Sequence, residues 1–395
     1  MKQHGASDID RRHFLAGAIA GVVLAPAWIS SAVAAAANVA DAKPAAPGTV
    51  PRSRAARLAA CTAGLDVARR QILQYCAHLD FPNGAIHAVR ALGRDTPLGS
   101  GDPYRVLLEA FTVERVVGQR PLLEVPVRYE GHPNAMLKTL IEKKCESDLE
   151  FTVQGRTYHF RDLVESARLL VAYPGTLPID EHSWTIIAMA QLLPVGHGTW
   201  SNVAGERVDL GQMIDDTSAA LLQDTELIRH VDLENLDPPR DCPIYGRVCG
   251  GLHMLYALAV AMAHGWSTPA RRKKFALHMR TAIRRLSYDE NVIDSVEKQN
   301  VKLAGADAAR AVAYDARVKL LGHLLEVFGV VDRSRSYVFS AAERRAIDAA
   351  RERLCATLAA GRDLPFERFK NNAVLYDSAT TGICHAYNGL QLSPG

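Results

Sequence analysis

Apolar residues recur along the chain from Ala55 onward at the spacing of helix turns. In stretches such as residues 254–262 and 318–327 they return at i, i+3, i+4 and i+7, which is typical of helices. Proline and glycine pairs such as Pro238-Pro239 separate these stretches. Alternation typical of strands is confined to short segments such as residues 122–127 and 151–160. The pattern predicts an all-α fold with small β insertions.

A histidine stands at the start of an apolar helical stretch in six places. They are His87, His132, His182, His253, His323 and His385, separated by 45, 50, 71, 70 and 62 residues. Each interval has room for a helix that begins at the histidine, a connection and a returning helix. About six such hairpins can close into an α/α toroid, in which the inner helices run parallel and bring their N-terminal ends to one rim.

A second repeat supports this alignment. Residues 151–164 match residues 202–214, and their glycines, Gly155 and Gly205, are 50 positions apart. That offset is the same as the one between His132 and His182. Each segment predicts a short β-hairpin that turns at its glycine and leads into a helix.

Three motifs connect the chain to a known family. Residues 249–258 (CGGLHMLYAL), Lys298-Gln299-Asn300 and residues 322–326 (GHLLE) resemble, in this order, motifs of exported, mostly uncharacterised bacterial proteins. These proteins look like the terpenoid-cyclase and protein-prenyltransferase type of α/α toroid, so the resemblance implies that fold. It runs from about residue 107 to the C-terminus. The chain departs from the family at Val301-Lys302-Leu303, where a loop with Asp-Gly-Ser is typical.

The N-terminal residues 1–42 have the pattern of a targeting segment. Arg11-Arg12 precedes Phe14-Leu15 and an apolar run over residues 16–33, which is typical of a twin-arginine export signal. Cleavage sites follow Ala34 and Ala42, and an uncleaved anchor is the alternative. We therefore predict a periplasmic or secreted protein that meets the twin-arginine export machinery. Residues 43–57 are interpreted as a flexible leader and residues 58–395 as the toroid domain.

Composition excludes some partners. No later segment has the run of about 20 apolar residues that a membrane span needs, so no stable span is expected after cleavage. The net charge is +3, part of it in the signal and leader, and no basic stripe with interleaved aromatics argues for nucleic acid. The seven cysteines form no disulfide framework. The best local candidate for a bridge is Cys242 with Cys249, across a short turn.

The strongest candidate site consists of polar residues at the predicted helix starts. Cys249 and His253 are i and i+4, and His323 and Glu326 are i and i+3, so each pair shares a helix face. Imidazole, thiolate and carboxylate are ligands that zinc prefers. The predicted metal ligands are therefore Cys249, His253, His323 and His385. The predicted catalytic residues are His253, His323, Glu326 and His385, together with Asp315. The alternative is structural, with each histidine bonded to a neighbouring loop.

Asp315 is a further catalytic candidate. Tyr314-Asp315 and Tyr376-Asp377 precede His323 and His385 by eight or nine residues, which predicts two loops leading onto the rim. A carboxylate there can orient a metal-binding histidine or act as a general base. The alternative is a helix N-cap.

Asp215 belongs to a weaker motif. Residues 214–219 resemble the Asp-x-Asp-Asp-Thr-Ala box of class II terpene cyclases, whose middle acid protonates an alkene. Met213 stands where the first aspartate of that box belongs, and a solvated helix start is the alternative.

These patterns leave three hypotheses open. The first is an exported enzyme with a polar central funnel, without or with a transition metal such as zinc, that acts on a small or oligomeric ligand. The second is a non-catalytic ligand-binding or scaffold protein with the same funnel. The third, a terpenoid cyclase-like enzyme, requires Asp215 to face the cavity.

Overall fold

The computed structural model describes residues 54–173, 175, 177–230, 242–304, 306–364, 366–370 and 373–393. This part is mostly helical and contains three two-stranded sheets, which confirms the all-α class. The predicted signal and leader residues 43–53 lie outside it. Helix α3 begins at Arg54, so the last residues assigned to the leader are helical. In the described part, every helix falls short of the length or apolar character needed to cross a bilayer.

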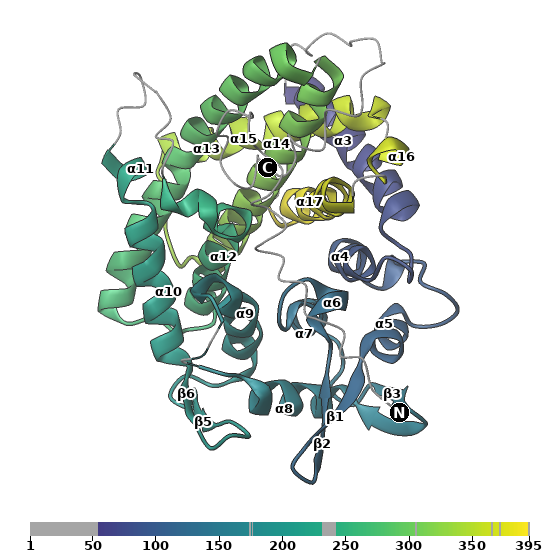
Figure 1. Cartoon of the computed structure of the whole chain (residues 1–395). Helices are drawn as coiled ribbons and strands as arrows, with labels where there is room; N and C mark the ends of the chain where they lie inside the picture. Colours follow the sequence, from purple (N-terminus) through teal and green to yellow (C-terminus); the bar gives the residue numbers. More distant parts are fainter. Residues whose placement is uncertain are drawn as a thin grey trace.

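Six helices line the centre of the molecule, and we call them the central helices (Figure 1). They are α4 (Pro82–Leu92), α7 (Ala135–Glu142), α9 (Ser183–Leu192), α12 (Leu252–Ala263), α14 (Ala306–Ser334) and α17 (Ala373–Leu392). Each contacts the next in this order, and α17 contacts α4, so their contacts form a closed cycle. Helix α12 is apolar almost all round and buried nearly throughout, as expected for a helix covered on all sides.

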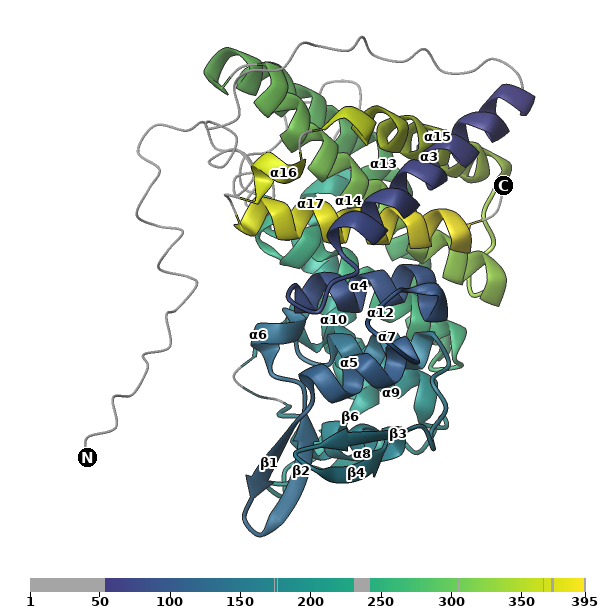
Figure 2. The ribbon, with the colours of Figure 1, turned by 90° about the vertical axis from the view of Figure 1, so that its right-hand side faces the viewer.

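A second set of helices lies around the central helices (Figure 1). It comprises α3 (Arg54–Tyr75), α5 (Pro103–Phe111), α8 (Phe160–Leu170), α10 (Leu210–Asp224), α13 (Pro269–Ala304) and α15 (Ala341–Ala360). Helices α3 and α5 are nearest the viewer in Figure 2, and all of this set except α8 pack on central helices. Helix α13 includes Val301 and Leu303, so the loop expected there is wrong. The short helices are η1 (Gly93–Asp95), α6 (Val127–Glu130), η2 (Ile179–His182), α11 (Glu226–His230), η3 (Pro243–Gly246), η4 (Val248–Gly251), η5 (Gly361–Asp363) and α16 (Phe366–Phe369).

The strands form three antiparallel hairpins, which lie together at one end of the molecule (Figure 1). They pair β1 (Val113–Val117) with β2 (Arg120–Glu124), β3 (Glu150–Val153) with β4 (Arg156–His159), and β5 (Thr199–Ser201) with β6 (Arg207–Asp209). The two predicted hairpins are confirmed, with Gly155 and Gly205 at φ +81° and +78° in their turns. The sequence pattern indicated only one strand of the third hairpin.

The helix starts expected at the histidines are only partly correct. His132, His182 and His253 do lie at or just before the first turn of a helix. His323, however, lies in the middle of α14, and His385 lies in the middle of α17. His87 is likewise inside α4. The positive ends of helices therefore do not converge on these three histidines. The helices begin earlier than the apolar pattern indicated, because their first turns contain polar residues.

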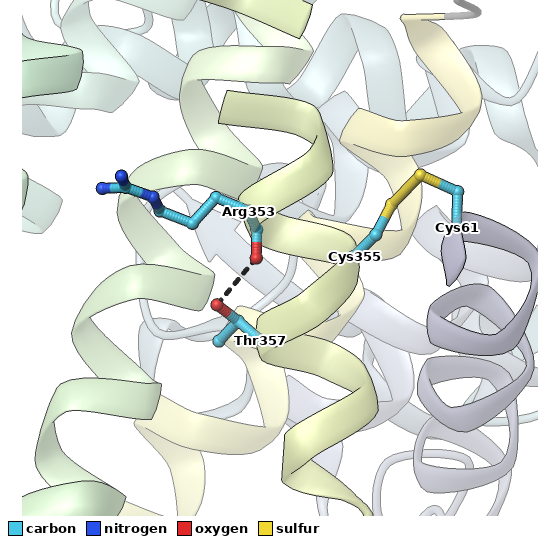
Figure 3. Close-up of a disulfide and its surroundings, with 4 residues drawn as sticks. All are labelled: Cys61, Arg353, Cys355 and Thr357. Carbon is cyan, nitrogen blue, oxygen red and sulfur yellow. Dashed lines mark hydrogen bonds between the residues drawn. A yellow bond between two sulfur atoms is a disulfide. The ribbon is translucent and has the colours of Figure 1, made fainter. Parts of the chain in front are cut away.

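A disulfide joins the first long helix of the described chain to a helix in its C-terminal part. Cys61 of α3 is bonded to Cys355 of α15, 294 positions away in the sequence (Figure 3). The expected bridge between Cys242 and Cys249 is wrong, since both are free. Helix α3 packs on α15, and α4 packs on α17, so the bridge fixes the first hairpin to the last one.

Removing this bridge is expected to destabilise the protein. In the Cys61→Ser/Cys355→Ser double variant, the free energy of unfolding should fall by about 2–5 kcal/mol, because the disulfide restricts a very long loop in the unfolded chain. Denaturant unfolding measures the difference, with Cys145→Ser as the control because Cys145 is a free thiol. A double variant as stable as the control would show that noncovalent contacts alone hold the first and last helices together.

Helices α14 and α17 are in close backbone contact at two glycines. A Cβ added to Gly322 would lie 2.7 Å from the backbone N of Ala386, and one added to Gly389 would lie 2.5 Å from the backbone O of Gly322. Gly322 precedes His323, and His385 precedes Ala386. The close approach therefore sets the separation of the two histidines.

We expect Gly322→Ala to lower stability by about 1–3 kcal/mol, because the methyl group must push the two backbones apart. Gly246→Ala is the control, since nothing lies within 4 Å of its added Cβ, and its effect should be within about 0.5 kcal/mol. Urea unfolding of both variants provides the comparison. Equal stabilities would contradict the close helix contact.

Candidate metal centre

Five of the six histidines gather between the central helices. The ring centroids of His323 and His385 are 3.7 Å apart, and those of His253 and His323 are 4.5 Å apart. His87 adjoins His385 at 5.1 Å, and His132 adjoins His253 at 6.1 Å.

The sixth, His182, packs its ring edge-on against Tyr173 at 4.9 Å. It is buried, and burial lowers its pKa. The structure therefore brings together the three histidines singled out for chemistry, and it places His182 elsewhere.

Cys249 stands in a constrained turn just before α12. It has φ 47° and ψ 37°, and Gly250 and Gly251 are also left-handed, at φ 60° and 71°. The left-handed conformation costs a residue with a Cβ about 1–2 kcal/mol. Such conformations persist where the surrounding structure imposes them, and they are common at functional sites. The turn places the partly exposed Cys249 beside the buried His253, one turn into the helix.

His323 is held in one orientation by Glu326. Its Nδ1 is 3.4 Å from Glu326 Oε2, and both side chains are 1% exposed. Its other nitrogen, Nε2, is buried and has no hydrogen-bond partner of normal geometry in the described part of the chain. Burial lowers the pKa of His323, but the neighbouring Cys249 thiol and Glu326 raise it above its usual value. A buried polar atom without a partner is costly, so it calls for an explanation. A carboxylate that holds one nitrogen while the other stays free is the usual arrangement around a metal-binding histidine.

The ligand atoms of Cys249, His253 and His323 all lie within 4.8 Å of one another. Burial raises the pKa of the Cys249 thiol, but the neighbouring His323 lowers this pKa below its usual value. Burial and His323 hold the pKa of His253 well below its usual value, so this ring is neutral. A neutral imidazole and a readily ionised thiol are the forms that bind zinc. This cluster is the candidate metal centre.

A second cluster, formed by His323, Glu326 and His385, also lies within 4.8 Å. A guanidinium already occupies it: Arg90 Nη1 lies 2.5 Å from Glu326 Oε1 and 2.6 Å from His385 Nδ1. Because arginine only donates, Nδ1 of His385 accepts from it and does not donate to Glu326. Asn388 donates another hydrogen bond to Glu326 Oε1, at 2.8 Å. The predicted ligand His385 thus lies beside the candidate metal centre and binds Arg90.

Arg90 connects this cluster to a further layer of buried charge. Its Nε donates to Glu142 Oε2 at 3.1 Å, and Lys138 Nζ lies 3.2 Å from the same oxygen. Tyr256 donates to the other oxygen of Glu142 at 2.8 Å. Burial and Arg90 lower the pKa of Lys138 to about 8, although Glu142 opposes the shift.

Sequence reasoning missed this layer of Arg90, Lys138, Glu142 and Tyr256. The sequence contains a signal for only two of them, because Arg90 and Lys138 each interrupt an apolar stretch shortly after a histidine.

Asp315 does not lie in a loop. It is 1% exposed inside α14, two turns before His323, and Asp377 likewise lies inside α17. Ser378 donates to Asp315 at 2.8 Å, and Lys319 Nζ is 3.8 Å away. Burial lowers the pKa of Lys319, but the charges of Asp315 and Cys249 raise this pKa above its usual value. Asp315 therefore balances the charge of a partly buried lysine near Cys249.

The structure contradicts the interpretation of Asp215 as a protonated acid. Arg271 Nη2 forms an ion pair with Asp215 at 2.8 Å, and the side chain of Asp215 is 41% exposed. The hydrogen bond from Arg271 lowers the pKa of Asp215. An alkene-protonating acid needs a dry pocket that raises its pKa, so the terpenoid cyclase hypothesis loses its catalytic residue.

Comparisons with known proteins found no matching family model, curated protein or solved structure. We therefore infer the function from the geometry of the candidate metal centre.

Proposed function

We propose that this chain is a metal-dependent enzyme whose ion is bound by Cys249, His253 and His323. The observation that carries the proposal has two parts: ligand atoms of the three residues lie within 4.8 Å of one another, and His323 Nε2 is buried without a hydrogen-bond partner among the described residues. One sulfur and two nitrogens form a ligand set that zinc prefers, and three protein ligands leave a coordination position open. A zinc ion so bound supplies Lewis-acid chemistry or an activated water, which suits hydrolysis or elimination.

The surrounding residues supply orientation and charge balance. Glu326 orients His323 and is kept ionised by Arg90, which lowers its pKa well below the usual value although burial opposes this. His132 is partly exposed and stacks on Trp184 with ring centroids 4.0 Å apart, next to His253. These rings and the partly exposed Cys249 mark the side of the candidate metal centre from which a small or oligomeric substrate reaches it.

The proposal extends to fold and location. The closed cycle of contacts supports an α/α toroid, as the resemblance to exported bacterial toroid proteins implies. The twin arginines support export through the twin-arginine machinery to the periplasm or beyond. The Cys61–Cys355 disulfide supports an oxidising compartment.

A non-catalytic ligand-binding or scaffold protein is the second candidate. The observation in its favour is the Arg90 cluster, in which Glu326 and His385 already have protein partners. In such a protein the histidines serve packing and charge balance only.

Metal content distinguishes the two. The mature protein, exported natively and purified without chelators, should contain about one equivalent of zinc or another transition metal. His323→Ala should lose the metal, and His78→Ala should keep it, because His78 is exposed and its Nε2 bonds to the Gln74 carbonyl, four residues earlier in the chain. A metal-free protein whose thermal stability is unchanged by chelators would overturn the enzyme proposal in favour of the binding protein.

A further inference from the structure

A cavity of about 380 Å³ opens at the end of the central helices opposite to Cys249. We call it the end cavity, and the last turns of α7, α9, α12, α14 and α17 line it. Its wall includes Ala263, the last residue of α12, whereas Cys249 precedes the first. The lining extends back along α12 to Tyr256, three residues after His253, but it does not include Cys249, His253 or His323. The volume is in the range of small-molecule pockets, about 300–1,000 Å³.

The floor of the end cavity is electrically balanced. Glu142 and Tyr256 reach it from the buried charge layer. The charge of Glu142 is offset there by Arg90 and Lys138, both within 3.2 Å of its Oε2. Asn388, which also lines the cavity, donates to the carboxylate of Glu326. The floor therefore contributes polar groups without a free charge.

The wall carries two cations that lack an acidic partner. Lys143 and Arg333 both line the end cavity, and in the described chain no carboxylate lies within ion-pair distance of either. Arg333 uses its Nε to donate to the Gly329 carbonyl, which leaves its terminal nitrogens for another acceptor. Burial lowers the pKa of Lys143, and the charges of Arg90 and Arg333 lower it further. Two neighbouring cations at one cavity attract an anion.

The uncharged polar residues of the lining indicate which other groups a ligand of the end cavity carries. Gln191 and Ser334 line the cavity with an amide and a hydroxyl group. The amide nitrogen of Gln191 already donates to the Ile187 carbonyl, so its oxygen remains as an acceptor. This amide oxygen and the Ser334 hydroxyl are suited to hydrogen-bond the hydroxyl groups of a ligand.

We propose that the end cavity binds a small polyhydroxylated organic anion, with its negative group on Lys143 and Arg333. This inference goes beyond the proposed metal chemistry and does not require it. The cationic wall selects the charge, and the acceptors around it select hydroxyl groups.

Three six-carbon probes test the proposal by isothermal titration calorimetry on the full protein: D-gluconate, neutral sorbitol and cationic glucamine. They share a polyol chain and differ at one terminal group. Gluconate should bind at least about tenfold more tightly than sorbitol, because hydrogen bonds to charged groups are strong, and glucamine should not bind. The Lys143→Met/Arg333→Met variant should lose the preference for gluconate, whereas Lys144→Met, next to the cavity but outside its lining, should retain it.

Equal binding of gluconate and sorbitol would overturn the proposal, as would no binding of any probe. A gluconate preference that survives in the double variant would also overturn it. Circular dichroism shows whether the double variant is folded; if it is not, the single variants Lys143→Met and Arg333→Met are used, and each should weaken gluconate binding. Metal content is measured on the same samples, so failure here is distinguishable from failure of the metal centre.

Discussion

Replacing Arg90 with methionine is expected to lower the free energy of unfolding by about 3–5 kcal/mol. The side chain of Arg90 is 4% exposed and lies between the carboxylates of Glu326 and Glu142. Without it, Glu326 remains buried and charged with no cation in contact, which is the costly way to break a buried ion pair. Denaturant unfolding monitored by circular dichroism measures the loss.

Arg94 provides a matched control one helical turn further along the chain. It also pairs with two carboxylates, those of Asp102 and Glu146, but its side chain is 46% exposed. Arg94→Met should therefore cost no more than about 1 kcal/mol. Similar losses in the two variants would show that Arg90 is not the partner that neutralises the buried carboxylates.

Cys249→Ser is expected to weaken metal binding at least about a hundredfold. Even substitutions of residues that orient a ligand cost 10–100-fold in metal affinity, and Cys249 is proposed to bind the ion itself. Glu326→Gln should fall in the range of about 10–100-fold, since Glu326 only orients His323. Competition with a chromophoric chelator measures the affinities.

The control for this series is Cys145→Ser, which removes a free thiol outside the candidate metal centre. It should leave the metal affinity unchanged. An affinity as high in Cys249→Ser as in Cys145→Ser would exclude the thiol as a ligand, and the ion would then have to be held by histidines alone.

Local patterns predicted the helical class and two hairpins. The glycine turns at Gly155 and Gly205 lie within one short segment each, so neighbouring residues determine them. The repeat of histidines also predicted that His253, His323 and His385 lie together, and their rings do adjoin, although His253 is at the start of its helix and the other two are in the middle of theirs.

Features that depend on distant segments could not be predicted in this way. Cys61 and Cys355 carry no local signal of their pairing, since they meet only when the last hairpin packs on the first. Arg90 looked like an ordinary polar residue of a helix, although it is the counter-ion of a carboxylate 236 positions away. The polar first turns of α14 and α17 also hid the true helix starts, so Asp315 was expected in a loop.

The most direct test of the central claim is X-ray absorption spectroscopy at the edge of the metal in the natively exported protein. If Cys249, His253 and His323 bind zinc, the first shell should contain one sulfur at about 2.3 Å and nitrogen or oxygen neighbours at about 2.0–2.1 Å. A first shell without sulfur, or a protein without metal, would contradict the account.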